Sequence, residues 1–272
     1  MEPFQLHAEE YFLIKPWSHM DSSLVAGFTT RKNGVSPFPK ASLNLAFHVG
    51  DTLDNVQSNR EKLGELLNFP VNHWVSTEQV HDTRIHTVTK ESRGSGAYSL
   101  EDCIRETDGL LTNESGVLLT LCYADCVPIY FFDPGSKWIG IAHAGWKGTT
   151  RNIAGKLVQT LQEKGVAISN MKAAIGPSIC KSCYIVDDRV IGAVRELLEE
   201  NDEKPYNEVE EGQYQLNLKQ LNLQLLKKAG IKESNISVTD YCSACDSEWF
   251  FSHRRDKGVT GRMLSFIGWR ED

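Results

Sequence analysis

Side chains that bind metals or attack substrates occur in three short segments, each beside residues that favour tight turns. The segments are TEQVHD, YADCVP and AHAGWKG, and they contain His81, Cys126 and His143. Two imidazoles and one thiolate suit zinc, and three protein ligands leave a fourth tetrahedral position open for water or substrate. Zinc held in this way lowers the pKa of a bound water to about 7. We therefore take His81, Cys126 and His143 as a candidate catalytic zinc site.

The long separations between these residues leave other interpretations open. No short regular metal motif joins them, so spacing alone favours buried structural histidines and cysteines. A second functional hypothesis pairs Cys126 with His143 as nucleophile and base, because a neighbouring imidazole activates a thiolate. Metal binding and nucleophilic catalysis would use the same atoms.

Two further cysteine pairs, Cys180 with Cys183 and Cys242 with Cys245, have the C-x2-C spacing. Together they could form a four-thiolate structural zinc site. The pairs are much farther apart in sequence than those of a compact zinc ribbon, so we expect partly buried free thiols instead. Cys122 is expected to be a core residue of the strand before Cys126 rather than a further ligand.

The composition favours a globular protein that acts on small molecules. A chain of 272 residues can bury a substantial core without a metal, and no repeat, low-complexity tract or linker divides it, so we expect one domain over residues 1–272. The net charge of -7 disfavours nucleic acid as the main partner. Neither a membrane span nor a secretory signal is recognisable, which predicts a cytoplasmic protein with reduced thiols, whereas the oligomeric state is not predicted.

Short apolar strands alternate with amphipathic helices along most of the chain. The expected strands are 24–30, 74–77, 84–88, 117–121, 128–132, 138–143, 171–175, 236–239 and 262–267. The expected helices are 52–67, 149–164, 188–200 and 218–229, which places His143 where a strand ends and a helix begins. Strands outnumber helices and some are joined by short turns. This pattern favours an α+β fold of mixed sheets and helices over a doubly wound parallel sheet.

Successive segments over nearly the whole chain resemble the signatures of the laccase-domain family, also called the polyphenol oxidase or YfiH/YlmD family. They are TTRKNGVS, SLNLAFHVGD, EQVHD, TDGLLT, ADCVPI, AHAGWKGT, IGPSICKSCYIV and FFSHRRDKGVTGRM. The bacterial YlmD branch is the most similar. The resemblance implies an α+β fold likened to cysteine hydrolases and one zinc bound by His81, Cys126 and His143. It also implies phosphorolysis of adenosine, guanosine, inosine and methylthioadenosine, with deamination of adenosine.

These activities suggest roles for further residues. Asp125 is a candidate proton carrier in deamination, although an aspartate at this position can equally orient the turn. Phosphorolysis needs cations that hold phosphate, and the ribose or the base needs polar partners. The candidate substrate contacts are Arg31, Asn44, His48, Arg60 and Lys147, with Arg254 or Arg255 as further cations.

The oxidase activity described for some members of the family has a weaker basis in this sequence. Blue multicopper oxidases gather several coppers with repeated His-x-His pairs, and none of the eight histidines here is spaced in that way. Copper could still enter the pocket of His81, Cys126 and His143, since these ligands bind copper at least as well as zinc. We therefore keep copper as an alternative metal and oxidase activity as an alternative function.

Overall fold

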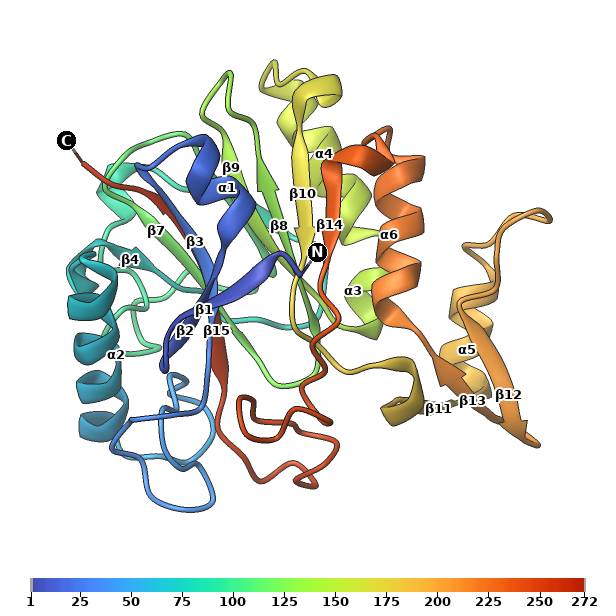
Figure 1. Cartoon of the computed structure of the whole chain (residues 1–272), viewed down its shortest axis with the longest axis horizontal. Helices are drawn as coiled ribbons and strands as arrows, with labels where there is room; N and C mark the ends of the chain where they lie inside the picture. Colours follow the sequence, from blue (N-terminus) through green and yellow to red (C-terminus); the bar gives the residue numbers. More distant parts are fainter. Residues whose placement is uncertain (1, 272) are drawn as a thin grey trace.

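Two six-stranded sheets lie face to face in the computed structural model, which describes residues 2–271 (Figure 1). The first sheet has the order β1 (Phe4–Ala8), β2 (Tyr11–Ile14), β3 (Leu24–Thr29), β15 (Met263–Trp269), β7 (Leu118–Tyr123) and β4 (Trp74–Val75). The second has the order β14 (Ile236–Val238), β10 (Lys172–Ile175), β8 (Val127–Phe132), β9 (Ile139–Ala144), β6 (Gly109–Thr112) and β5 (Ile85–Thr87). Both sheets combine parallel and antiparallel pairs, so the α+β prediction is confirmed.

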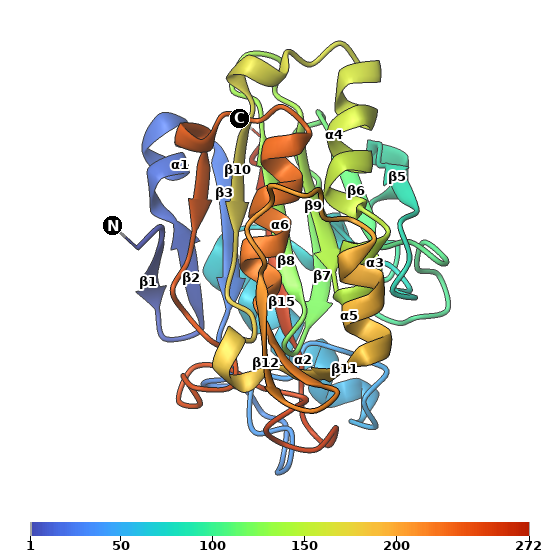
Figure 2. The same ribbon diagram turned by 90° about the vertical axis from the view of Figure 1, so that its right-hand side faces the viewer.

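Helices cover the outer faces of the two sheets. Helix α2 (Leu53–Leu67) packs on the first sheet, where Leu63 and Leu67 meet Leu264 and Phe266 of β15. The second sheet is covered by α3 (Trp146–Thr150), α4 (Ile153–Glu163) and α6 (Leu218–Lys228), as Figure 2 shows. The short helix α1 (Lys15–Met20) joins β2 to β3. The molecule is therefore built in layers of helix, sheet, sheet and helix.

The alternating direction of side chains along the strands explains this layering. Successive side chains of a strand point to opposite faces, so a strand buried on both sides is apolar at every position. In β8, Ile129 and Phe131 contribute to the core under the helices, whereas Tyr130 and Phe132 contribute to the core between the sheets. This arrangement accounts for the continuous apolar runs of the central strands.

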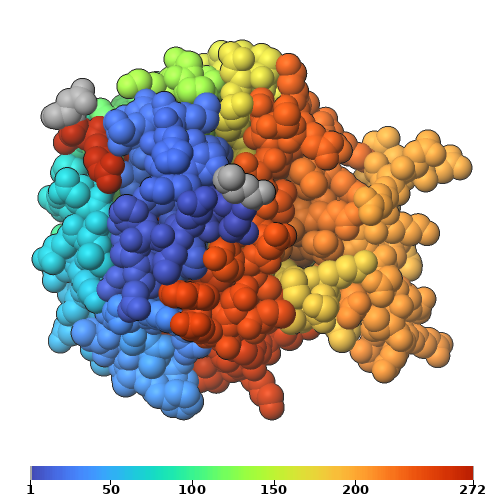
Figure 3. Space-filling view, viewed as in Figure 1, coloured from blue at the N-terminus to red at the C-terminus, as the bar shows by residue number. Residues whose placement is uncertain are grey.

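A small third sheet projects from the main body together with α5 (Asp188–Arg195) (Figures 1 and 3). Its order is β11 (Ile185–Asp187), β13 (Gln213–Leu216) and β12 (Tyr206–Glu210). The sequence analysis missed these strands because their exposed positions carry mostly polar residues. It also missed β1, β2 and β6.

The predicted helix 149–164 needs a correction. It is divided into α3 and α4 at Asn152, which has a left-handed backbone (φ 59°) and whose side chain accepts a hydrogen bond from the amide of Gly155. This side-chain cap starts a new helix with its own direction. The first helix therefore begins directly after β9, at Trp146, closer to His143 than predicted. No helix within residues 2–271 is long and apolar enough to cross a membrane.

Candidate metal centre

The three predicted ligands meet where the chain passes from one six-stranded sheet to the other. Strand β7 belongs to the first sheet and β8 to the second, and the turn between them contains Asp125, with φ 91°, and Cys126. His143 lies near the end of β9, paired with Pro128 of β8. His81, in the loop after β4, also has a positive φ of 59°. Hydrogen bonding between β8 and β9 therefore brings His143 beside the segment that carries Cys126.

The ligand atoms of His81, Cys126 and His143 all lie within 4.8 Å of one another. The two imidazole rings are 4.7 Å apart between centroids and nearly perpendicular, with an interplanar angle of 79°. Gly145 leaves room for them, since a Cβ at this position would lie 3.0 Å from Cys126 Sγ and 3.1 Å from His81 Cδ2. The expectation that these distant residues converge is confirmed.

Asp108 orients two of the three side chains, and the sequence analysis did not single it out. Its buried carboxylate accepts a hydrogen bond of 2.7 Å from His143 Nδ1. The same carboxylate accepts the backbone amides of Val80, His81 and Asp82 at 3.0, 3.1 and 3.0 Å, which holds the turn that presents His81. The TDGLLT segment contains this aspartate, but only the fold places it between the two histidines.

The charges of these groups are strongly coupled. Burial by itself would raise the pKa of the Cys126 thiol, but His143 beside it and hydrogen bonds to both histidines lower that pKa to about 6. Burial would lower the pKa of His143, whereas the Cys126 thiolate and Asp108 raise it to about 9. Burial would also raise the pKa of Asp108, and its hydrogen bonds to His143 and to backbone amides lower it. The centre therefore favours a thiolate at neutral pH.

The donor set fits zinc. Thiolate and imidazole are usual zinc ligands, and because Asp108 bonds to His143 Nδ1, Nε2 of that ring is the nitrogen that would bind a metal. A carboxylate that fixes a ligand histidine in this way is common around protein-bound zinc. His81, Cys126 and His143 are the residues that would hold the ion.

A cavity of about 620 Å³ opens onto this centre, a size suited to a small molecule. Its wall contains His48, Gln79, Tyr184, Arg254 and Arg262 as well as the three ligands. Two guanidinium groups and several hydrogen-bonding side chains thus face the same space as the candidate metal. The sequence analysis did not single out Gln79 and Arg262, although they lie in the segments TEQVHD and FFSHRRDKGVTGRM, because only the fold shows that they line the cavity.

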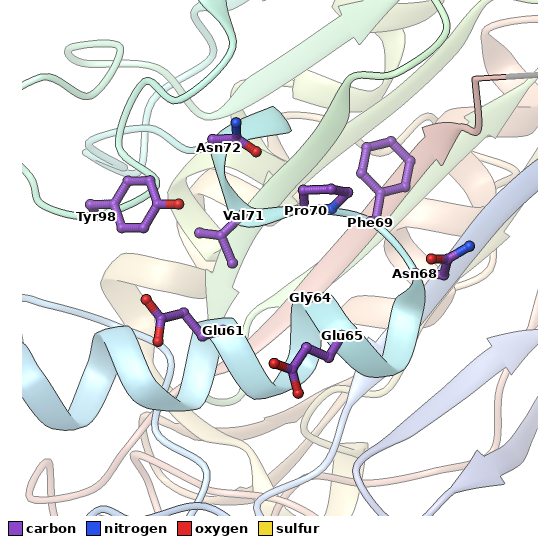
Figure 4. Close-up of a pocket in the computed structure, with 9 residues that line it drawn as sticks. All are labelled: Glu61, Gly64, Glu65, Asn68, Phe69, Pro70, Val71, Asn72 and Tyr98. Atoms are coloured by element: carbon purple, nitrogen blue, oxygen red, sulfur yellow. The ribbon is translucent and has the colours of Figure 1, made fainter.

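A second hollow, of about 350 Å³, lies between α2 and the segment 68–72 (Figure 4). Glu61 and Glu65 project from one face of the helix, and Tyr98 lies across the hollow. Its lining includes no histidine, cysteine, lysine or arginine. This hollow therefore lacks the imidazole, thiol and cationic groups that line the larger cavity.

Three of the predicted substrate contacts, Arg31, Arg60 and Asn44, do not line this cavity, and their substrate role stays a prediction. Arg31 donates through Nε and Nη2 to the carbonyl of Ala41, and Arg60 is fully buried and donates to the carbonyls of Leu45, Gly96 and Ala97. These arginines hold loops, because their donors already have backbone partners.

The third residue outside the cavity wall is Asn44, which is fully buried. Its amide donates to the Ala46 carbonyl and to Asp51, and its oxygen accepts the amide of Arg262. Asn44 therefore fixes the segment directly before β15, which carries Arg262.

The other predicted residues divide between the cavity and its surroundings. Lys147 is exposed beside a different hollow, with its ammonium 5.8 Å from the centroid of the Trp146 ring. His48 does line the cavity, and burial together with the charges of Arg262 and Arg60 lowers its pKa to about 4. Neutral His48 can thus accept or donate a hydrogen bond to a ligand.

Asp125 also lines the cavity, but both of its oxygens have partners in the protein. Oδ1 accepts the Ser243 hydroxyl at 2.6 Å and Oδ2 accepts the amide of Arg254 at 2.7 Å. These bonds fix the loop that presents Arg254. The proton-carrier role of Asp125 stays a prediction beside this positioning role.

The two C-x2-C pairs lie next to each other, although the sequence analysis expected them to be separate. The thiols of Cys180, Cys183, Cys242 and Cys245 all lie within 4.8 Å of one another, and we call them the four-thiol cluster. Cys122 lines the cavity but is not one of the three clustered ligands, and burial raises the pKa of its thiol.

The layered α+β fold and the centre of two histidines and one cysteine define a laccase-like domain. Residues 25–270 match the family described as multi-copper polyphenol oxidoreductase laccase, and the chain belongs to this family.

Relatives and solved structures agree with this assignment. The chain is 49% identical over 249 residues, 91% of each chain, to the purine nucleoside phosphorylase YlmD of Geobacillus stearothermophilus. It is 44% identical over 273 residues, 99% of this chain and 98% of the relative, to the protein of the same name from Bacillus subtilis. The crystal structure of YlmD from Geobacillus stearothermophilus superimposes with a TM-score of 0.97, at 46% identity and 100% coverage of both chains.

Proposed function

We propose that this protein is a zinc-dependent purine nucleoside phosphorylase. The observation that carries the proposal is one cavity in which His81, Cys126 and His143 face Arg254 and Arg262. Relatives of this chain that are named purine nucleoside phosphorylases support it. Bound zinc would act as a Lewis acid that stabilises negative charge developing on the reactants.

Phosphorolysis requires phosphate to approach the anomeric carbon of the ribose while the purine leaves as an anion or is protonated. We assign phosphate binding to Arg262 and Arg254, whose guanidinium groups offer paired donors. Nη1 of Arg262 donates to the carbonyls of Thr260 and Gly261, which fixes the head group at the cavity wall. His48 and Gln79 would hydrogen-bond the nucleoside.

The substrates proposed are adenosine, guanosine, inosine and methylthioadenosine, with deamination of adenosine as a second activity. Deamination would need a proton donor for the departing ammonia, and Asp125 in the cavity wall is the nearest carboxylate to Cys126 in sequence. The seven cysteines are free, which is consistent with the reducing cytoplasm as the place of action.

Two alternative functions use the same centre. The lowered pKa of Cys126 beside His143 supports a metal-free hydrolase in which the thiolate is the nucleophile. Copper in place of zinc would support a polyphenol oxidase, in agreement with the description of the matched family.

Product analysis after metal control tests these proposals. Protein purified without added metal is incubated with adenosine, with and without phosphate, and the products are separated by chromatography. We expect adenine only with phosphate and inosine in either condition, with both activities lost after chelation and restored by zinc. Turnover of adenosine that resists the chelator would favour the hydrolase, and oxygen-dependent oxidation of a phenol that only copper restores would favour the oxidase.

Two variants connect this assay to the site. Cys126→Ser should lose the metal of this centre and turnover, whereas Cys103→Ser, which changes a buried cysteine that belongs to neither cluster, should retain them. Arg262→Gln should raise the KM for phosphate more than the KM for adenosine, because it removes one charged phosphate partner. Equal changes in the two KM values would contradict the assignment of Arg262.

A further inference from the structure

The four-thiol cluster lies at the ends of two neighbouring parallel strands. Strands β10 and β14 pair in parallel, with Ile175 opposite Val238, and each is followed a few residues later by a C-x2-C pair. Ser178 and Cys242 continue the pairing as an isolated parallel bridge, and the Ser243 amide donates to the Ser178 carbonyl at 3.2 Å. Parallel strands end at the same edge of a sheet, so the fold brings together pairs that are distant in sequence.

The sulfur atoms lie close enough together for a tetrahedral thiolate site. Cys180 Sγ lies 3.8 Å from Cys245 Sγ, and Cys183 Sγ lies 3.3 Å from Cys245 Sγ. Zinc bonds to sulfur of about 2.3 Å in a tetrahedron place the sulfurs about 3.8 Å apart. All four thiols are free, so no disulfide competes for them.

Backbone amides and a buried cation surround the sulfurs. The amides of Cys180 and Cys245 point at Cys242 Sγ, at 3.2 and 3.4 Å, and such N–H groups favour the thiolate form. Lys219 is buried, with its ammonium bonded to the carbonyls of Thr239 and Tyr241 at the start of the second pair. Its positive charge offsets part of the negative charge that four thiolates would carry.

We propose that Cys180, Cys183, Cys242 and Cys245 bind a second, structural zinc ion, separate from the centre of His81, Cys126 and His143. Four protein ligands fill a tetrahedron and leave no position for substrate, so this site would stabilise structure rather than react. The proposal does not depend on the function assigned to the other centre.

The proposed zinc would fix one wall of the catalytic cavity. Tyr184, which lines the cavity, directly follows Cys183, and Ser243, between the cysteines of the second pair, donates to Asp125. Asp125 in turn accepts the amide of Arg254. A metal that clamps the two pairs together therefore holds the loops that carry Tyr184 and Arg254.

Zinc counting on the intact protein and on matched variants tests the proposal. Elemental analysis should find about two zinc ions per chain in the unchanged protein, and about one in Cys126→Ser and in the double variant Cys183→Ser/Cys245→Ser. Cys103→Ser should keep both. The double variant should also unfold at a temperature lower by at least about 5 °C, because it loses a ligand that binds only the folded state.

Cobalt replacement gives a second measurement that does not depend on folding of the double variant. In Cys126→Ser refolded with cobalt, the four-thiol cluster should produce the intense visible bands and thiolate charge-transfer absorption of tetrahedral cobalt bound to sulfur. A Cys126→Ser protein that holds no zinc and forms no such bands would overturn the proposal. So would a disulfide between the pairs in protein purified under reducing conditions, or iron in place of zinc in the cluster.

Discussion

Asp108 offers a sharp test of how the metal centre is built, through the substitution Asp108→Asn. Each of its two oxygens accepts two hydrogen bonds: Oδ2 from the amides of Val80 and Asp82, and Oδ1 from the His81 amide and His143 Nδ1. An asparagine would replace one of these oxygens by an NH2 group. The two hydrogen bonds to that oxygen are then lost, and their two donors face the N–H donors of the new amide. At about 1.5–3 kcal/mol for each bond to a buried charge, the free energy of unfolding should fall by about 3–6 kcal/mol.

The same change should weaken zinc binding at His81, Cys126 and His143 by about 10- to 100-fold, because His143 loses the partner that orients its ring. Urea unfolding of the metal-free protein measures the first effect, and competition with a coloured chelator measures the second. Asp82→Asn is the matched control, since its ion pair with Arg151 is exposed and is worth at most about 1 kcal/mol. If Asp108→Asn resembled this control in both measurements, our account of Asp108 would be refuted.

Three further predictions concern the centre and its support. In metal-free protein, Cys126 should be alkylated with a midpoint near pH 6 rather than 9, and His143→Ala should move the midpoint upward. Because the pKa of Cys126 is lower in the folded than in the unfolded protein, the thiolate's contribution to stability is complete above about pH 9 and is lost as the pH falls through about 6. An alkylation midpoint near pH 9 would contradict the pairing of the Cys126 thiolate with His143. Gly145→Ala, which places a Cβ 3.0 Å from Cys126 Sγ and 3.1 Å from His81 Cδ2, should weaken zinc binding at least about tenfold in chelator competition; unchanged affinity would show that the site expands freely. Arg60→Met should lower the free energy of unfolding, measured in urea, by about 3–5 kcal/mol and leave kcat unchanged, because buried carbonyls lose their donor. A lower kcat at unchanged stability would indicate instead that Arg60 contacts the substrate.

The central strands could be predicted well from the sequence. Strands such as β8 and β15 are buried on both faces, so their apolar runs are continuous and are bounded by turn residues. Strands β12 and β13 were missed because their exposed polar residues resemble a loop. The break between α3 and α4 at Asn152 was also missed, since asparagine can either cap a helix or lie within one.

The residues of the candidate site, like the elements of the fold, could be predicted only in part. The residue types of His81, Cys126 and His143 indicated metal chemistry, and the segments around them resemble those of a known family. Arg31 and Arg60, however, were predicted to contact substrate because arginine suits phosphate. Whether a guanidinium group faces a ligand or a backbone carbonyl depends on which loops surround it, and residue type and local spacing do not reveal this.

By itself the sequence determined the reactive groups, the main strands and the resemblance to the laccase-domain family, because these depend on residue type and local order. Only the tertiary structure decided which groups meet. Pairing of β8 with β9 placed His143 beside Cys126, Asp108 joined the two histidines, and the parallel pair of β10 and β14 brought together the four-thiol cluster. Such contacts arise from the register and direction of strands that are far apart in the chain, which no local spacing of residues reveals.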